Sequence, residues 1–109
     1  MNARLKKSEI LKDKKAISCL FEKGEWSRGR YVNIVSLPAE TRQVLFTAAR
    51  IVKGAVARNR GKRYLRESYR LNKSCFSFER IYGLILKRFP ESSPLRYIEN
   101  DIRMQLQHD

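Results

Sequence analysis

The segment from Lys53 to Lys73 constrains the fold more than any other part of this sequence. On a helix at 100° per residue it separates into two faces. Small and apolar side chains form one face, which can pack on a core: Ala57, Gly61, Tyr64, Leu65, Ser68 and Asn72. Polar and cationic side chains fill the remainder, with Glu67 as the only acidic residue: Arg58, Asn59, Arg60, Lys62, Arg63, Arg66, Arg70 and Lys73. A helix of about 18 residues would carry this charge over roughly 27 Å.

Like charges on one helix face repel each other and lower stability unless a polyanion relieves the repulsion. On a helix face that is only solvated the two signs of charge normally alternate, whereas this helix has one acidic residue among its many basic ones. The pattern therefore favours phosphate binding over a role in solubility alone.

The charge of the chain is concentrated in the same region. Residues 50–73 contain nine basic residues and one acidic residue, whereas residues 91–109 have a net charge of −2 within a chain of +13. This balance predicts an anionic partner, with nucleic acid favoured over a membrane surface. No apolar run has the length of a signal or transmembrane segment, so we expect a cytoplasmic protein.

The length of 109 residues predicts a single RNA-binding domain over residues 1–109, with residues 1–9 as a flexible basic arm. Asp13 is expected to cap a helix that ends at Gly24, and residues 26–29 to connect it to the first strand. The remaining predicted elements are a strand over 30–37, an antiparallel partner over 43–49, the basic helix, a buried strand over 81–86 and a helix starting at Ser93 and Pro94. The fold class is α+β: a small, mostly antiparallel sheet packed with three helices in the order α-β-β-α-β-α, with room for one further short strand.

The sequence lacks a constellation that could carry out catalysis by itself. The only histidine, His108, lies next to the C-terminus, and Glu67 is best explained as a partner of Arg63 or Arg70. Cys19 and Cys75 are expected to be reduced thiols, and no set of residues predicts a metal site in the protein. These observations indicate a binding protein.

Several motifs in the basic helix resemble the signature helix of the bacterial ribonuclease P protein component. They are Ala55-Val56, Arg58-Asn59-Arg60, Lys62-Arg63, Arg66-Glu67 and Tyr69-Arg70, and the similarity extends upstream through Leu11-Lys12, Ile17, Leu20-Phe21 and Gly24. The resemblance implies a left-handed strand–helix–strand crossover. It also implies a subunit that binds the catalytic ribonuclease P RNA and the 5′ leader of precursor tRNA, and so promotes endonucleolytic removal of the leader. The chemistry would reside in the RNA, which would bind most of the required Mg²⁺. The resemblance implies neither a membrane nor a protein partner.

The resemblance also assigns binding residues in this chain. RNA would be bound by Arg50, Lys53, Arg58, Asn59, Arg60, Lys62, Arg63, Arg66 and Arg70, and the leader would lie in a cleft lined by Ile17, Phe21, Tyr31, Asn33 and Val35. Ile17 and Val35 stand where the family usually has aromatic residues, and core packing is the favoured interpretation of both. Tyr31 and Asn33 are predicted to share the strand face of Val35 and to supply the missing contacts.

Gly61 stands where the family has a branched apolar residue. A glycine inside a helix costs about 1 kcal/mol relative to alanine, so Gly61→Ala is expected to stabilise the fold.

Two other classes of protein remain as alternatives. One is a non-catalytic basic RNA-binding protein of a ribosome-like particle. The other is a peripheral membrane binder, which is disfavoured because Gly61, Ser68 and Asn72 occupy the face that would need bulky apolar side chains.

Overall fold

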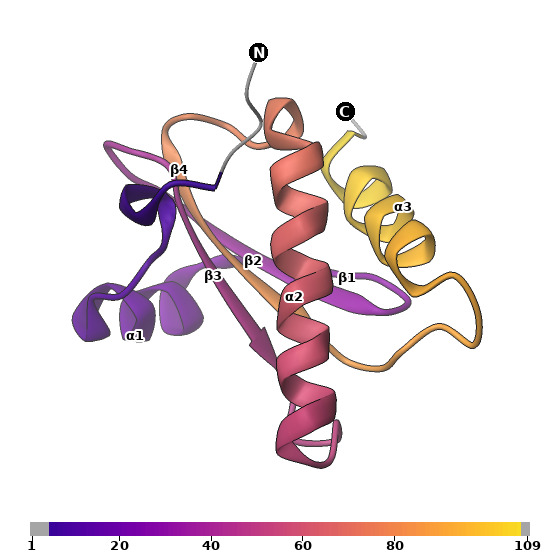
Figure 1. The fold of residues 1–109 in the computed structure, drawn as a ribbon. Coiled ribbons are helices and arrows are strands. Elements are labelled where there is room, and N and C mark those ends of the chain that lie inside the picture. The colour runs from indigo at the N-terminus through magenta and orange to yellow at the C-terminus, as the bar shows by residue number, and fades with distance from the viewer. Residues whose placement is uncertain (1–4, 108–109) are drawn as a thin grey trace.

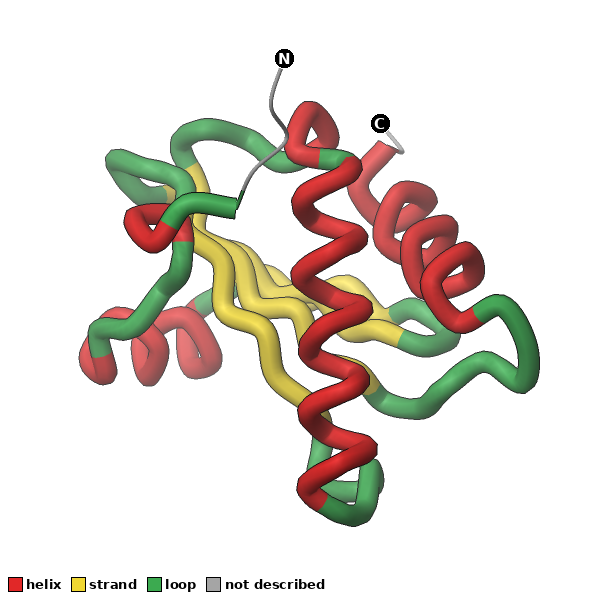
Figure 2. Tube along the Cα trace, viewed as in Figure 1, coloured by secondary structure: helices red, strands yellow, loops and turns green. Residues whose placement is uncertain are grey.

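The computed structural model describes residues 5–107, so His108 and the first four residues of the predicted arm lie outside the described part. Three helices pack on a four-stranded sheet, which confirms the predicted α+β class (Figures 1 and 2). The elements are η1 (Lys7–Glu9), α1 (Lys14–Lys23), β1 (Glu25–Arg28), β2 (Val32–Pro38), β3 (Gln43–Ala48), α2 (Ala55–Leu71), η2 (Lys73–Cys75), β4 (Arg80–Leu86) and α3 (Pro94–Gln107).

The strands lie in the order β1-β2-β4-β3, so the sheet is mixed. β4 pairs antiparallel with β2 and parallel with β3, and Gly83 lies between Val35 and Leu45. The predicted antiparallel pairing of the strands at 32–38 and 43–48 is therefore wrong. β4 therefore has a neighbouring strand on each edge and is covered on both faces. This position accounts for its nearly continuous apolar run, because most of the strand is buried.

α2 connects the two parallel strands. In Figure 1 it lies in front of the sheet, β3 and β4 both run downward, and β4 lies to the right of β3. This geometry is a left-handed crossover, which agrees with the expectation from the family and departs from the usual right-handed rule.

The sheet has a separate core on each face. On one face Val32, Ile34 and Leu84 pack beneath α2 and α3, where Leu65 and Ile98 are fully buried. On the other face Val35 and Ile81 pack with Leu20 of α1. The alternation of Val32 and Ile34 against Val35 follows from the two-residue period of a strand.

Residues 25–28 form an edge strand and not the predicted connector. β1 pairs antiparallel with β2, with Trp26 opposite Val35 and Ser27 opposite Ile34. This is the additional short strand for which the predicted element order left room.

The turn between β1 and β2 is attached to α3 by two polar side chains. The Asp101 carboxylate accepts hydrogen bonds from the backbone N–H groups of Arg30, Tyr31 and Val32 at 2.9–3.2 Å. The Gln105 amide donates to the Val32 carbonyl at 2.8 Å. Three charge-assisted bonds to one carboxylate fix the position of residues 30–32.

Asp13 caps α1 as predicted, because its carboxylate accepts a hydrogen bond from the Ala16 N–H at 3.0 Å. The described part of the predicted arm is different. Lys7–Glu9 form a 3-10 turn, Glu9 is buried, and Ile10 forms a β-bridge with Val44. The prediction of a flexible segment is therefore wrong for residues 7–9.

Candidate nucleic-acid interface

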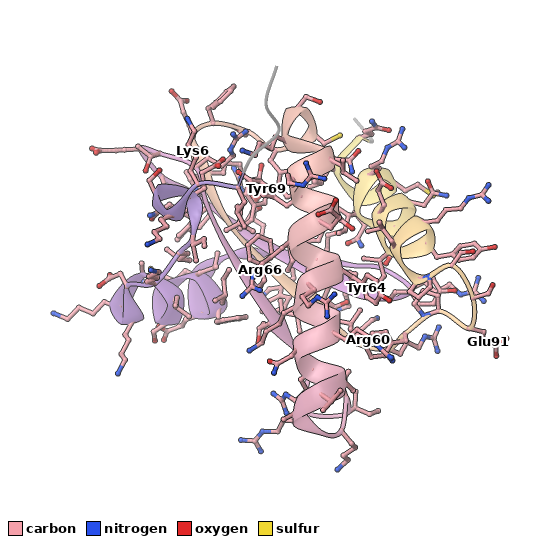
Figure 3. The ribbon with its side chains drawn as sticks, in the orientation of Figure 1. Lys6, Arg60, Tyr64, Arg66, Tyr69 and Glu91 are labelled. Atoms are coloured by element: carbon pink, nitrogen blue, oxygen red, sulfur yellow. The ribbon has the colours of Figure 1, made fainter. Side chains whose placement is uncertain are left out.

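The basic helix has its core face and its cationic face where the helical periodicity of the sequence predicts them. Gly61, Leu65 and Ser68 are buried. Tyr69 is buried as well, although the helical periodicity did not place its large side chain on the core face. The exposed outer side carries Asn59, Arg60, Arg63 and Arg66, and three half-buried cationic residues flank it: Arg58, Lys62 and Arg70. Figure 3 shows Arg66 projecting from α2 on the β3 side and Arg60 on the side of the β4–α3 connection.

The loop before α2 adds two further charges at the start of the same helix. Arg50 and Lys53 are both exposed, while Val52 between them is buried and anchors the loop. Gly54 then enters the helix with a φ of 89°, a left-handed conformation that favours glycine. The structure therefore brings the predicted residues at 50 and 53 to one end of the cationic helix.

Three arginines of α2 are held by neighbouring groups. The Arg58 guanidinium donates to the Ala48 carbonyl at 3.2 Å. The Arg66 guanidinium lies 5.9 Å from the ring centre of Phe46, and that of Arg60 lies 4.8 Å from the ring centre of Phe89. Such contacts reduce the conformational entropy that an arginine loses when it binds a phosphate group.

Glu67 pairs with Arg70, one of its two predicted partners. The Arg70 Nε donates to Glu67 Oε1 at 3.1 Å, and a second nitrogen donates to the other oxygen. These hydrogen bonds lower the pKa of Glu67, so the carboxylate stays ionised. Arg70 is therefore partly neutralised, whereas the exposed side chains of Arg63 and Arg66 form no ion pair with any residue that the structure describes.

On the opposite face of the sheet, the predicted cleft residues of α1 pack on the core cluster that contains Val35. Ile17 and Phe21 are half-buried and pack with Leu45 and Ile85 on the same cluster. Val35 itself is fully buried, so the packing interpretation of this residue is confirmed and it offers no surface to a ligand.

Asn33 also belongs to this face, two residues from Val35 and opposite Ile85 of β4. Its side-chain oxygen is buried and has no hydrogen-bond partner in the described part of the chain. An unpaired buried oxygen lowers stability, and because this oxygen is buried it offers no surface to a ligand.

Tyr31 does not share this face, and the prediction that it does is wrong. It precedes the first residue of β2, and its side chain packs against the core beneath α2 and α3. The hydrogen bonds that the N–H groups of residues 30–32 donate to Asp101 hold the chain there, so strand alternation does not extend to Tyr31. Tyr31 therefore cannot replace the aromatic residues that α1 and β2 lack.

Trp26 is a candidate residue that the sequence prediction missed. Its ring is 45 % exposed and lies 5.8 Å from the Phe21 ring, centre to centre. Its register opposite Val35 places it on the α1 side of the sheet. The signal was hidden because residues 25–28 contain only one apolar side chain and do not have the pattern of a strand.

A buried ionic cluster holds the C-terminal part of α2. The Glu9 carboxylate accepts hydrogen bonds from Tyr69, Arg42 and Lys73 at 2.7, 3.3 and 2.8 Å. Burial opposes ionisation, yet the hydrogen bonds from Lys73 and Tyr69 lower the pKa of Glu9 to about 2. Burial and the bond to Glu9 raise the pKa of Tyr69. The cluster joins residues far apart in the sequence, and no local pattern could have revealed it.

Neither a metal cluster nor a membrane span is found within residues 5–107. No group of three or more His, Cys, Asp or Glu side chains there could hold a metal ion, and none of the helices there is both long and apolar enough to cross a membrane. Cys19 and Cys75 are free thiols, as predicted. The expectation that RNA binds most of the Mg²⁺ stays a prediction.

Comparison with known proteins identifies the family of this chain. The sequence profile of the Ribonuclease P family matches residues 5–108. The ribonuclease P protein component of Chlorobaculum tepidum is 39% identical over 79 residues, which cover 64% of this chain and 51% of that protein. The chain thus matches only about half the length of this curated relative.

Solved structures with low sequence identity share the fold. The ribonuclease P protein from Thermotoga maritima has a TM-score of 0.78 at 17% identity, covering 93% of this chain and 98% of its own. A mutant ribonuclease P protein from Staphylococcus aureus, described as defective in mRNA degradation, has a TM-score of 0.79 at 18% identity, covering 93% of this chain and 87% of its own.

A small α+β domain whose outer helix is strongly basic is typical of nucleic-acid-binding proteins. The family match, which covers all the described residues, narrows this class to one family. The chain belongs to the ribonuclease P protein family.

Proposed function

We propose that this chain is the protein subunit of a bacterial ribonuclease P and binds the catalytic RNA through α2. The observation that carries the proposal is the outer surface of α2, where Arg60, Arg63 and Arg66 are exposed and form no ion pair with described residues. Planar guanidinium groups can bind phosphate oxygens through two hydrogen bonds at once. Arg50 and Lys53 would extend the contact beyond the start of the helix.

The second part of the proposal concerns the 5′ leader of precursor tRNA. It would lie on the α1 side of the sheet, where Phe21 and Trp26 offer two neighbouring aromatic rings close to the half-buried Asn33. Bases of any sequence can stack on aromatic rings, which suits leaders of variable sequence. The two proposed contacts would use opposite faces of the sheet, so one protein could bind both RNAs together.

The hydrolysis itself is proposed to take place on the RNA subunit with its Mg²⁺ ions. Mg²⁺ requires near-ideal octahedral geometry and usually keeps several waters, so it suits a site formed by phosphate oxygens. The protein would add positive charge beside both RNAs and lower the Mg²⁺ concentration needed for their assembly. The cytoplasmic location expected from the sequence stays a prediction.

Reconstitution tests this function directly. The protein is mixed with a bacterial ribonuclease P RNA and precursor tRNA at a low Mg²⁺ concentration, where the RNA alone is slow, and accurate 5′ maturation is measured. We expect the wild-type chain to restore cleavage and the double variant Arg63→Gln/Arg66→Gln to restore less. The matched control is Arg96→Gln/Arg103→Gln, which removes two exposed charges from α3.

Two results would contradict the proposal. One is cleavage that does not depend on the protein at any Mg²⁺ concentration. The other is tight binding to unrelated structured RNA with no preference for the ribonuclease P RNA, which would favour the alternative of a basic protein of another ribonucleoprotein particle.

A further inference from the structure

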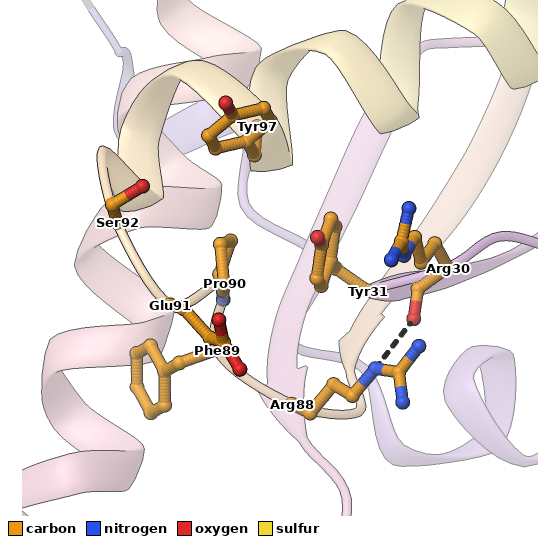
Figure 4. Close-up of a pocket in the computed structure, with 8 residues that line it drawn as sticks. All are labelled: Arg30, Tyr31, Arg88, Phe89, Pro90, Glu91, Ser92 and Tyr97. Carbon is orange, nitrogen blue, oxygen red and sulfur yellow. Dashed lines mark hydrogen bonds between the residues drawn. The ribbon is translucent and has the colours of Figure 1, made fainter.

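A pocket of about 430 Å³ lies beside α3, between the β1–β2 turn and the β4–α3 connection (Figure 4). Its volume falls within the range of about 300–1,000 Å³ that is usual for ligand sites. Tyr31 borders it from the strand side, and Tyr97 borders it from the first turns of α3, where its ring is 42 % exposed. Two tyrosines around one opening provide flat surfaces on which a planar ring could stack.

The same pocket has two arginines at its edge. The guanidinium groups of Arg30 and Arg88 lie 5.6 and 5.7 Å from the ring centre of Tyr31. The Arg88 Nε donates to the Arg30 carbonyl at 3.2 Å, which fixes the direction of this side chain. Neither arginine forms an ion pair with an acidic residue in the described part of the chain. Their charge is therefore available to an anionic ligand.

Phe89 connects this pocket to the cationic surface of α2. Its ring points toward α2 in Figure 4 and packs edge-on against Tyr64, with 6.3 Å between ring centres. The Arg60 guanidinium covers the same ring at 4.8 Å. An RNA strand bound along Arg66, Arg63 and Arg60 could thus continue past Phe89 to Arg88 and Arg30, with Glu91 as the one acidic residue among those that line the pocket.

We infer that this pocket binds one unpaired nucleotide of the RNA that lies along α2. The base would stack on the exposed ring of Tyr97, across the opening from the half-buried Tyr31, and the adjoining phosphates would bind to Arg88 and Arg30. The exposed Glu91 carboxylate at the rim can accept a hydrogen bond from an amino group of the base. This inference rests on the proposed function, because it takes the RNA on α2 as its starting point.

The test compares two ligands that carry the same number of phosphates. One is a single-stranded RNA of about 15 nucleotides, and the other is an abasic ribose–phosphate chain of equal length. Tyr97→Ala is expected to weaken binding of the RNA at least about fivefold, the loss of one base stack, and to leave the abasic chain unaffected. Arg88→Gln should weaken binding of both ligands. The matched control, Arg96→Gln, removes an exposed charge from α3 outside the pocket and should weaken binding of either ligand less than Arg88→Gln does.

Two further measurements keep the inference separate from the proposed function. If Tyr97→Ala loses helical structure by circular dichroism, Tyr97→Leu replaces it, since leucine favours a helix and has no aromatic ring. If Arg63→Gln/Arg66→Gln weakens RNA binding while the Tyr97 variant binds both ligands like wild type, the pocket is overturned and the function of α2 stands. If the α2 variant binds RNA like wild type, the proposed function fails as well.

Discussion

The hydroxyl group of Tyr69 donates a hydrogen bond of 2.7 Å to the carboxylate of Glu9, sixty residues earlier in the chain. Both groups are buried, and Arg42 and Lys73 bind the same carboxylate. The bond attaches the segment before α1 to the last turns of the basic helix, so the position of that helix depends on Glu9.

Glu9→Gln should destabilise the fold by about 2 kcal/mol, because it leaves the charges of Arg42 and Lys73 without their carboxylate. The pKa of Glu9 falls from 4.5 to about 2 on folding. A lowered pKa stabilises the protein above pH 4.5, and this stabilisation is lost as the pH falls toward 2. Urea unfolding of the wild type and of Glu9→Gln between pH 2 and 7 should therefore show curves that converge at acid pH. Glu40→Gln, at an exposed position, is the control, and parallel curves for Glu9→Gln would contradict the assignment.

Gly61→Ala should destabilise the fold by about 1 kcal/mol, contrary to the gain expected from helix propensity. A Cβ atom at this position would lie 2.5 Å from Cδ2 of the fully buried Leu86. The loss of stability from overpacking is then larger than the stability gained from the higher helix propensity of alanine. Chemical denaturation of the single and double variants measures the effect.

Leu86→Val supplies the control for this substitution, because valine has no Cδ atom. In the Leu86→Val background Gly61→Ala should become neutral or stabilising, a coupling of about 1 kcal/mol or more. Equal effects of Gly61→Ala in both backgrounds would mean that Leu86 is not the residue that excludes a methyl group.

Arg63→Gln/Arg66→Gln should reduce the salt dependence of RNA binding. Each phosphate contact contributes roughly 0.7 to 0.9 to the slope of log affinity against log salt, so losing two contacts should reduce the slope by about 1.5. Glutamine is a good helix former, so the fold should be retained. Binding is measured from low to high salt by fluorescence anisotropy, and an unchanged slope, or an equal change in Arg96→Gln/Arg103→Gln, would place the RNA elsewhere.

Trp26→Ala should weaken the binding of precursor tRNA by about 1 kcal/mol or more, the value of one base stack, and leave mature tRNA unaffected. The side chain is partly exposed and lies on the edge strand β1, so the variant should still fold. Tyr31→Leu is the comparison, because Tyr31 lies on the other face of the sheet and its substitution should not discriminate between the two tRNAs. The assignment of the leader site is wrong if the Tyr31 variant loses affinity for precursor tRNA alone and the Trp26 variant does not.

Local patterns in the sequence predicted most of the elements, with β1 as an exception, but not the pairing of the strands. Helical spacing located α2 and α3, and the Asp13 cap located α1, because each signal arises within a few residues. Which strand lies beside β3 depends on contacts between residues 43–48 and 80–86, which no local pattern records. The family resemblance supplied the left-handed crossover. The cationic residues Arg60, Arg63 and Arg66 lie on the outer side of α2, as the helical periodicity predicted.

The cleft assignment depended on strand alternation, and it failed where that alternation stops. Tyr31 lies one residue before β2 and is held by Asp101, a partner seventy residues away. Glu9 gave no signal because an acid in a basic N-terminal segment looks solvated until Tyr69 and Lys73 are placed around it. These contacts are tertiary, so a single sequence without a structure does not reveal them.

The connection through α2 makes the charge of this helix part of the folding equilibrium. β3 and β4 can pair in parallel only when α2 crosses between them, so repulsion along its outer side opposes closure of the sheet. A polyanion that binds native α2 removes this repulsion and raises the free energy of unfolding by RT ln(1 + [L]/Kd). The melting temperature should therefore rise with the concentration of the RNA, so that assembly of the ribonucleoprotein and folding of its protein become one linked equilibrium.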